Sequence, residues 1–282
     1  MKRALSLGLS TLIGAALMTL WWSQYGADVE VVGTAQWEWL LAGFLCVPLV
    51  LWLQLQRTAR LLSSVNRQAL SSAVLLSHGM NVLLPSLLGD AYEVTSIAQH
   101  AQLQKRSVLI RLLHRLGSTL SALGLLMAIA LSSIEPNIAF FVLVGSFALP
   151  YIVDGTLPRI ADTLGAETVA PLGAAETSVH IILAMLQHTV SALSVFCLGL
   201  AINDAVSPTM SAAMLSIADL VTYLPVPLGG VGVNHWSVTT ICDRLGQIPA
   251  ALVAFNHAMV VLVGGVSAAI GLATKPKTMH NS

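Results

Sequence analysis

Long apolar runs alternate with short polar segments along most of this chain. A helix needs about 20 apolar residues to cross a hydrocarbon core of about 30 Å. The segment 154–176 holds four acidic residues and one arginine, so we expect it to be a loop. Six apolar runs predict full membrane spans, at residues 4–22, 39–56, 107–132, 137–153, 178–202 and 248–274.

Two further apolar stretches are interrupted by proline and glycine. Residues 70–104 contain the sequence Pro-Ser-Leu-Leu-Gly-Asp at 85–90, and residues 209–245 contain a stretch rich in proline and glycine at 225–232. Proline and glycine disfavour a continuous helix. Each stretch therefore predicts two short helical arms joined by a turn.

Lysine and arginine cluster at residues 2–3, 57–67, 105–106 and 275–277. By the positive-inside rule these clusters face the cytoplasm. Because the second and third clusters share one side, the stretch between them must enter the membrane and return as a re-entrant hairpin. The same reasoning makes residues 209–245 a hairpin that enters from the outer side. We expect an all-α polytopic membrane protein with six full spans, two re-entrant helical hairpins and both termini in the cytoplasm.

The two hairpin turns carry the same short motif. Leu-Pro at 84–85 and Leu-Gly at 88–89 recur at 224–225 and 228–229, a constant offset of 140. The order of span, span, hairpin and span is also repeated, with the opposite starting side. This pattern indicates an inverted-topology repeat, which is typical of transporters. The alternative is chance recurrence in a leucine-rich chain.

Composition excludes most other classes of protein. Hydrophobic residues make up 56% of the chain and charged residues 9%, whereas soluble domains carry about 25% charged residues. Thirteen basic residues balance thirteen acidic ones, which leaves no positive excess to bind nucleic acid. We therefore expect a single transmembrane domain over residues 1–282, with one repeat at about 1–134 and the other at about 135–275.

One predicted span carries three basic side chains in its first half. Arg111, His114 and Arg115 share a helical face through their i, i+3, i+4 spacing. An arginine deep in a bilayer costs about 2.5–3.5 kcal/mol on insertion scales, so it calls for a partner. Asp90 and Glu93 are candidate partners, and a lipid phosphate is another. We expect Arg111 to reach the cytoplasmic interface and Arg115 to be buried.

Glycines at the two hairpin turns are candidates for binding an anion. Gly89 lies in the first turn, and Gly229, Gly230 and Gly232 lie in the second. Backbone N–H groups at the start of a helix can hold a phosphate, and glycine lets the backbone approach it closely. The alternative is that these glycines only form the turn.

Other polar residues lie on predicted helices of the second half. Four share a face of the span at 178–202: His180, Gln187, His188 and Ser191. Three flank the second hairpin turn: Asp219, Tyr223 and His235. A single membrane histidine is more often packed and hydrogen-bonded than a proton carrier, and that interpretation stays open for each. Because no metal-ligand spacing and no nucleophile–base motif is visible, we expect no metal, no cofactor and no catalytic residue.

Two stretches resemble signatures of the lysylphosphatidylglycerol-synthase transmembrane family, also called the flippase-like domain family. Residues 81–90, together with His114-Arg115-Leu116, are similar to its first signature. Residues 224–233 resemble its second, a Pro-x-x-Pro-Gly-Gly-x-Gly-hydrophobic-x-Glu pattern. The resemblance implies that Asp90 matches an acid, that Arg115 matches a basic residue, and that the three glycines of the second turn match the family's glycines. Members of the family are proposed to move phospholipids or polyprenyl-phosphate sugars between leaflets.

The chain departs from that pattern at four positions. Leu228 stands where the family has proline, His235 where it has glutamate, and Glu93 where a basic residue is common. Ala258 replaces an arginine on the last span. These departures imply either a different substrate or a copy that has lost activity.

The expected function is that of an inner (plasma) membrane lipid transporter, not an enzyme. Its substrate would be an anionic lipid, either a phospholipid or a polyprenyl-phosphate-linked sugar, moved or bound between leaflets. The alternative is a non-transporting membrane subunit that scaffolds an envelope glycosyltransferase or a lipid-modifying enzyme. The expected partners are therefore membrane lipids and, in the second case, such an enzyme; nucleic acid is not among them.

Overall fold

The computed structural model describes Thr19, Ser23 and the residues 35–83, 88–132, 134–166, 171–202, 206–222, 233–245 and 250–276. Within these ranges the chain forms helices and no strand, which confirms the all-α prediction. The predicted first span lies outside the described residues apart from Thr19, as do residues 84–87 and 223–232 of the two hairpin turns.

In the part of the chain that the structure describes, five helices are long and apolar enough to cross a membrane, which supports a membrane protein. Four of them extend beyond the predicted spans at one or both ends, whereas the last lies within the predicted span at 248–274. Their bounds are α2 (Trp37–Leu61), α5 (Lys105–Leu131), α6 (Pro136–Leu164), α7 (Ala174–Ala201) and α11 (Ala250–Ala273).

Two helices begin at a proline. Helix α6 begins at Pro136, where the missing N–H of proline costs no helical hydrogen bond. Helix α8 begins at Pro208, and the Ser207 hydroxyl accepts a hydrogen bond from the Met210 N–H at 3.1 Å.

The prediction of a loop over 154–176 was wrong in its first half. Helix α6 continues through Pro150 and Pro158 to Leu164, and Gly165 ends it with a left-handed φ of 59°. Proline is tolerated in membrane helices where neighbours satisfy the freed backbone groups. Asp154, which suggested a loop, is buried inside the helix bundle.

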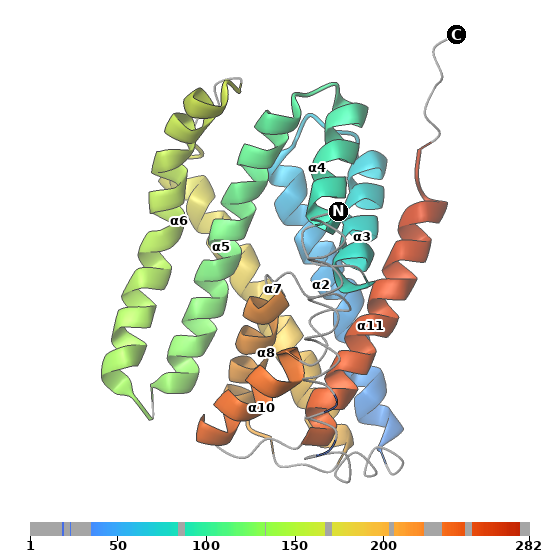
Figure 1. Cartoon of the computed structure of the whole chain (residues 1–282), viewed down its shortest axis with the longest axis vertical. Coiled ribbons are helices and arrows are strands. Elements are labelled where there is room, and N and C mark those ends of the chain that lie inside the picture. Colours follow the sequence, from blue (N-terminus) through green and yellow to red (C-terminus); the bar gives the residue numbers. More distant parts are fainter. Residues whose placement is uncertain are drawn as a thin grey trace.

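Two pairs of shorter helices form hairpins at opposite ends of the bundle (Figure 1). The first hairpin consists of α3 (Arg67–Leu83) and α4 (Leu88–Ala101). The second hairpin consists of α8 (Pro208–Thr222) and α10 (Val233–Leu245). Each arm has 13 to 17 residues, fewer than the roughly 20 that a full crossing needs.

The helix contacts are largely preserved when the two halves of the chain are exchanged. The exchange pairs α2 with α7, α3 with α8, α4 with α10 and α5 with α11. The contact between α2 and α7 is then unchanged, and the contact of α3 with α11 corresponds to that of α8 with α5. The contacts of α4 with α5 and of α2 with α3 correspond to those of α10 with α11 and of α7 with α8. The contact of α5 with α7 is an exception, since no α2–α11 contact of similar size occurs in the described part. An inverted repeat would produce this pairing of contacts.

Glycine brings α3 and α11 unusually close together. A Cβ at Gly79 would lie 2.5 Å from the Gly264 carbonyl oxygen, and a Cβ at Gly271 would lie 2.7 Å from the Leu76 nitrogen. The Ser72 hydroxyl also donates to the Gly271 carbonyl oxygen at 2.7 Å. Small residues and hydroxyl groups of this kind hold helices together in membranes, where apolar burial contributes little.

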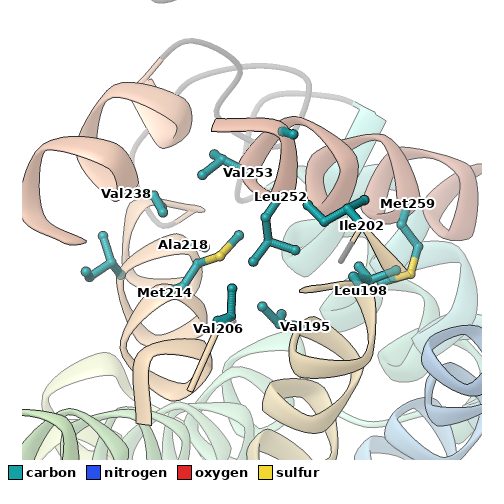
Figure 2. Packing of buried hydrophobic residues seen from close by; sticks show 12 residues of the cluster. Val195, Leu198, Ile202, Val206, Met214, Ala218, Val238, Leu252, Val253 and Met259 are labelled. Atoms are coloured by element: carbon teal, nitrogen blue, oxygen red, sulfur yellow. The ribbon is translucent and has the colours of Figure 1, made fainter. Parts of the chain in front are cut away.

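Each hairpin has its own apolar core. Leu198 and Met214 meet Leu252 in a cluster that joins α7 and α8 to α11 and also includes Val238 of α10 (Figure 2). A separate cluster around Leu70 and the α4 residues Ile97 and Ala98 fixes the first hairpin to α2 and α5. These two cores position the polar side chains described next.

Candidate functional site

An ion pair joins the second arm of the first hairpin to the following span. Arg115 of α5 donates to both carboxylate oxygens of Glu93 on α4, over 2.6 Å from Nη1 and 2.9 Å from Nη2. The Glu93 side chain is 0% exposed and that of Arg115 is 13% exposed. Arg115 Nη1 also donates to the Thr58 hydroxyl at 2.8 Å. The guanidinium therefore holds a carboxylate with the two-point geometry that it also offers to a phosphate.

The start of α4 packs closely against α3 and thereby positions Glu93. A Cβ at Gly89 would lie 2.2 Å from the Ser77 carbonyl oxygen and 2.4 Å from the Asn81 side-chain oxygen, so only glycine fits. Asn81 Nδ2 donates to Asp90 Oδ1 at 3.0 Å, which links the two arms. Of the two predicted partners of Arg115, the structure thus brings Glu93 to it and holds Asp90 against Asn81.

Arg57 of α2 is a buried site residue that the sequence analysis missed. Its side chain is 1% exposed, and its Nη1 donates to Gln187 Oε1 of α7 at 2.8 Å. Its Nη2 donates to the Arg115 carbonyl oxygen at 2.9 Å and to the Ser118 hydroxyl at 2.8 Å. The sequence analysis assigned Arg57 to the cytoplasmic basic cluster. Arg57 directly follows an apolar run and lies one helical turn deeper than Arg60, and this position is the feature of the sequence that could have indicated its burial.

Arg111 lies apart from this buried group. It is exposed, and its Nη1 donates to the Leu61 carbonyl oxygen at the end of α2, at 2.9 Å. This contact places it at the helix ends rather than among the buried polar side chains. The arrangement agrees with the expectation that Arg111 reaches toward an interface.

His114 belongs to a different cluster from the two arginines. Its Nε2 lies 3.7 Å from Asp154 Oδ1 of α6, and its ring centroid lies 5.3 Å from that of His180 on α7. The Asp154 carboxylate also accepts the backbone N–H groups of Leu172 at 2.9 Å and Gly173 at 3.2 Å. The helical face shared by Arg111, His114 and Arg115 therefore does not converge on one ligand position.

The polar contacts continue to the second hairpin. His188 follows Gln187 on α7, and its Nδ1 lies 3.2 Å from Asp219 Oδ2 on α8. His188 is buried, whereas the Asp219 side chain is 34% exposed. Contacts thus run from Glu93 through Arg115 and Arg57 to Gln187. Its chain neighbour His188 makes the separate contact with Asp219.

The second hairpin has a contact equivalent to that between Glu93 and Arg115. His235 of α10 packs against His257 of α11, with ring centroids 4.7 Å apart. Both pairs join the second arm of a hairpin to the following span, and both are separated by 22 residues, with an offset of 142 between the pairs. His235 was predicted as a site residue, and its partner His257 was not.

Four predicted site residues cannot be placed. Tyr223, Gly229, Gly230 and Gly232 lie outside the described residues. The glycine-rich anion site at the second turn therefore stays a prediction. Among the described side chains, no group of three or more potential metal ligands occurs.

Comparison with known proteins adds no family assignment. No protein-family model matches this sequence, and no curated protein is similar to it at a significant level. The resemblance to the flippase-like domain family thus rests on the two hairpin motifs alone.

Proposed function

We propose that this protein binds an anionic lipid and moves it between membrane leaflets, as an inverted-repeat transporter of the inner (plasma) membrane. The observation that carries the proposal is the polar series that runs by contacts from Glu93 of the first hairpin to Gln187 of α7 and, through the chain neighbour His188, to Asp219 of the second hairpin. Charged side chains inside membrane bundles are costly, and they mark substrate or ion pathways. A series that joins both hairpins would let one substrate contact both halves of the protein.

The Arg115 fork is the proposed headgroup site. In the described structure the Glu93 carboxylate occupies it through two hydrogen bonds. A lipid phosphate presents two oxygens in the same arrangement and would compete with that carboxylate for the guanidinium. Glu93 would then act as an internal substitute that keeps Arg115 paired when no lipid is bound.

The distribution of charge supports the proposed orientation. Arg60 at the end of α2 pairs with Glu176 at the start of α7 at 3.0 Å, and Arg106 at the start of α5 donates to the Leu164 carbonyl oxygen at the end of α6. These contacts bring several basic helix ends to one end of the bundle. By the positive-inside rule that end would face the cytoplasm. The second hairpin would then enter from the opposite face.

The six-span inverted repeat is part of the same proposal. The exchange of helix contacts between the two halves supports it, as do the equivalent pairs on α4 with α5 and on α10 with α11. In such a repeat, the two hairpins alternate in opening toward their own sides of the membrane. The lipid headgroup would pass between them along the polar series.

Movement of labelled lipids in liposomes tests this function. Purified protein is reconstituted, and the transfer of fluorescent phosphatidylglycerol between leaflets is compared with that of phosphatidylcholine. We expect faster transfer of the anionic lipid, and a loss of about tenfold in Arg115→Lys, because lysine offers a point charge in place of a fork.

The matched control is Arg60→Lys, which changes an exposed arginine that pairs with Glu176. It should transfer lipid at the wild-type rate. Wild-type liposomes that transfer no faster than protein-free liposomes would contradict the transporter proposal. That result would favour the non-transporting subunit instead.

A further inference from the structure

Helix α2 contacts Arg115 at both its guanidinium and its backbone. The Thr58 hydroxyl accepts a hydrogen bond from Arg115 Nη1 at 2.8 Å. Arg57, the neighbouring residue on α2, donates from Nη2 to the Arg115 carbonyl oxygen at 2.9 Å. Thr58 is 0% exposed and Arg57 is 1% exposed. Two consecutive buried residues of one span thus hold both ends of a residue on another span.

We propose that Thr58 is a positioning residue of the headgroup site, whose hydroxyl keeps the Arg115 guanidinium in place while the Glu93 carboxylate and a lipid phosphate exchange on it. The exchange rests on the proposed lipid binding, whereas the orientation of the guanidinium by Thr58 does not. Thr58 acts through Arg115, and a direct bond between Thr58 and the lipid is not required.

The guanidinium has enough donors for both contacts. Each Nη atom of arginine carries two N–H groups. The fork uses one N–H from each Nη atom, which reach the two carboxylate oxygens of Glu93 at 2.6 and 2.9 Å. The bond to Thr58 uses the second N–H of Nη1. Departure of the carboxylate therefore leaves the bond to Thr58 intact, with the fork open to another acid.

The Thr58 hydroxyl is oriented to accept rather than to donate. Its own proton goes to the Gln54 carbonyl oxygen, one turn earlier on α2, at 3.0 Å. A hydroxyl has one proton and two acceptor lone pairs, so the bond to Gln54 leaves the lone pairs for Arg115. Helix α2 thus fixes the hydroxyl in the orientation that the guanidinium needs.

A fixed acceptor lowers the entropic cost of binding at the fork. An arginine side chain loses much rotamer freedom when it is held in one position. Because Thr58 already holds Arg115, an incoming phosphate would meet a guanidinium that is largely ordered, and preorganised groups bind more tightly. A hydrogen bond to a charged group corresponds to about tenfold or more in affinity. Loss of the Thr58 acceptor should therefore be measurable as weaker lipid binding.

A hydroxyl that only stabilises the helix bundle is the competing explanation, and two variants separate the two. Thr58→Val keeps the shape and removes the acceptor, whereas Thr58→Ser keeps the acceptor and removes a methyl group. Binding of phosphatidylglycerol to the purified full-length protein is measured in detergent micelles, together with thermal unfolding. We expect Thr58→Val to bind about tenfold more weakly, and Thr58→Ser to bind like the wild type.

The matched control is Thr163→Val on α6. The Thr163 hydroxyl donates to the Arg159 carbonyl oxygen at 2.8 Å, which is the same contact over four residues that Thr58 makes with Gln54. This variant should bind lipid like the wild type. Unchanged affinity in folded Thr58→Val would overturn the positioning role, even if its unfolding temperature falls. A loss that Thr58→Ser shares would overturn it too.

NMR of the protein labelled with ¹⁵N-arginine tests the orientation of the guanidinium without added lipid. The Arg115 signals are assigned by their absence in Arg115→Lys. We expect slow rotation about the Cζ–Nη1 bond in the wild type and in Thr58→Ser, and faster rotation in Thr58→Val. If Thr58→Val does not fold, the wild type is studied with phosphatidylglycerol, where Nη1 should remain ordered and free rotation would overturn the proposal.

The two measurements separate failure of this inference from failure of the proposed function. Absence of phosphatidylglycerol binding by the wild type would contradict the proposed function. The positioning role would then depend on the lipid-free guanidinium signals. Faster rotation in Thr58→Val than in Thr58→Ser would support it, and equal rotation in the two variants would overturn it.

Discussion

Glu93 with Arg115 and His235 with His257 occupy equivalent places in the two halves of the molecule. Each pair links the second arm of a hairpin to the following span, and each is separated by 22 residues. The first is a buried ion pair with two hydrogen bonds, whereas the second is a contact between two aromatic rings. The place of the contact is therefore shared while its chemistry differs. Replacing one residue of the first pair leaves the charge of the other buried without that partner. Replacing one residue of the second pair leaves no such charge.

The largest expected effect follows from that asymmetry. Arg115→Leu leaves the Glu93 carboxylate buried without its guanidinium, which should lower the free energy of unfolding by about 3–5 kcal/mol. Glu93→Gln in the same chain removes the stranded charge and should recover most of the loss. Denaturant unfolding of both single variants and the double variant, arranged as a double-mutant cycle, measures the coupling. Additive losses would contradict the buried ion pair.

An exchange of chemistry between the pairs should give the next largest effect. His235→Glu with His257→Arg places the charges of the first hairpin on the equivalent positions of the second. If the positions are equivalent, the free energy of unfolding of the double variant should be about 1–3 kcal/mol higher than the sum of the two single-variant effects predicts. The reciprocal double variant, Glu93→His with Arg115→His, places the histidine pair on the first hairpin and the following span. A coupling near zero would show that α10 and α11 do not reproduce the geometry of α4 and α5.

Gly89→Ala should have a smaller effect, confined to the first hairpin. The added Cβ would lie 2.2 Å from the Ser77 carbonyl oxygen, so the two arms would have to separate. Such overpacking costs about 1–3 kcal/mol. Gly265→Ala on α11 is the control, because a Cβ there meets no atom within 4 Å and alanine favours the helix. Thermal unfolding in detergent should separate the two variants, and equal midpoints would argue against close packing of the start of α4 on α3.

His257→Phe should have the smallest effect on stability. Phenylalanine keeps an aromatic ring against His235, and such ring contacts contribute about 0.5–1.5 kcal/mol beyond buried area. We expect His257→Phe to lower the free energy of unfolding by less than Arg115→Leu does in the same assay. A loss as large as that of Arg115→Leu would remove the contrast between the two hairpins.

Much of the fold followed from the apolar pattern and the helix-breaking residues. The arms of both hairpins and the all-helical class were predictable because these signals are local. The extension of α6 was not, because Asp154 indicates a loop until its partners are known. Those partners, the backbone N–H groups of Leu172 and Gly173, come from a later segment.

The polar contacts were less predictable for the same reason. Glu93 was a candidate partner of Arg115 because the two lie on consecutive elements, the second arm of the first hairpin and the span that follows it. Arg57 and Gln187 are 130 residues apart, and only the packing of α2 against α7 brings them together. The contact of His257 with His235 likewise depends on the packing of α10 against α11.

Site-directed cysteine labelling tests the central claim, that the two hairpins enter from opposite faces of the membrane. Single cysteines at Arg67, Lys105 and Thr209 are introduced after Cys46, Cys197 and Cys242 are replaced, and intact cells are treated with an impermeant thiol reagent. The account predicts that Thr209→Cys is labelled from outside, and that Arg67→Cys and Lys105→Cys react only after the membrane is opened. Labelling of Lys105→Cys from outside, with Arg67→Cys protected, would make the first hairpin a crossing segment and contradict the inverted repeat.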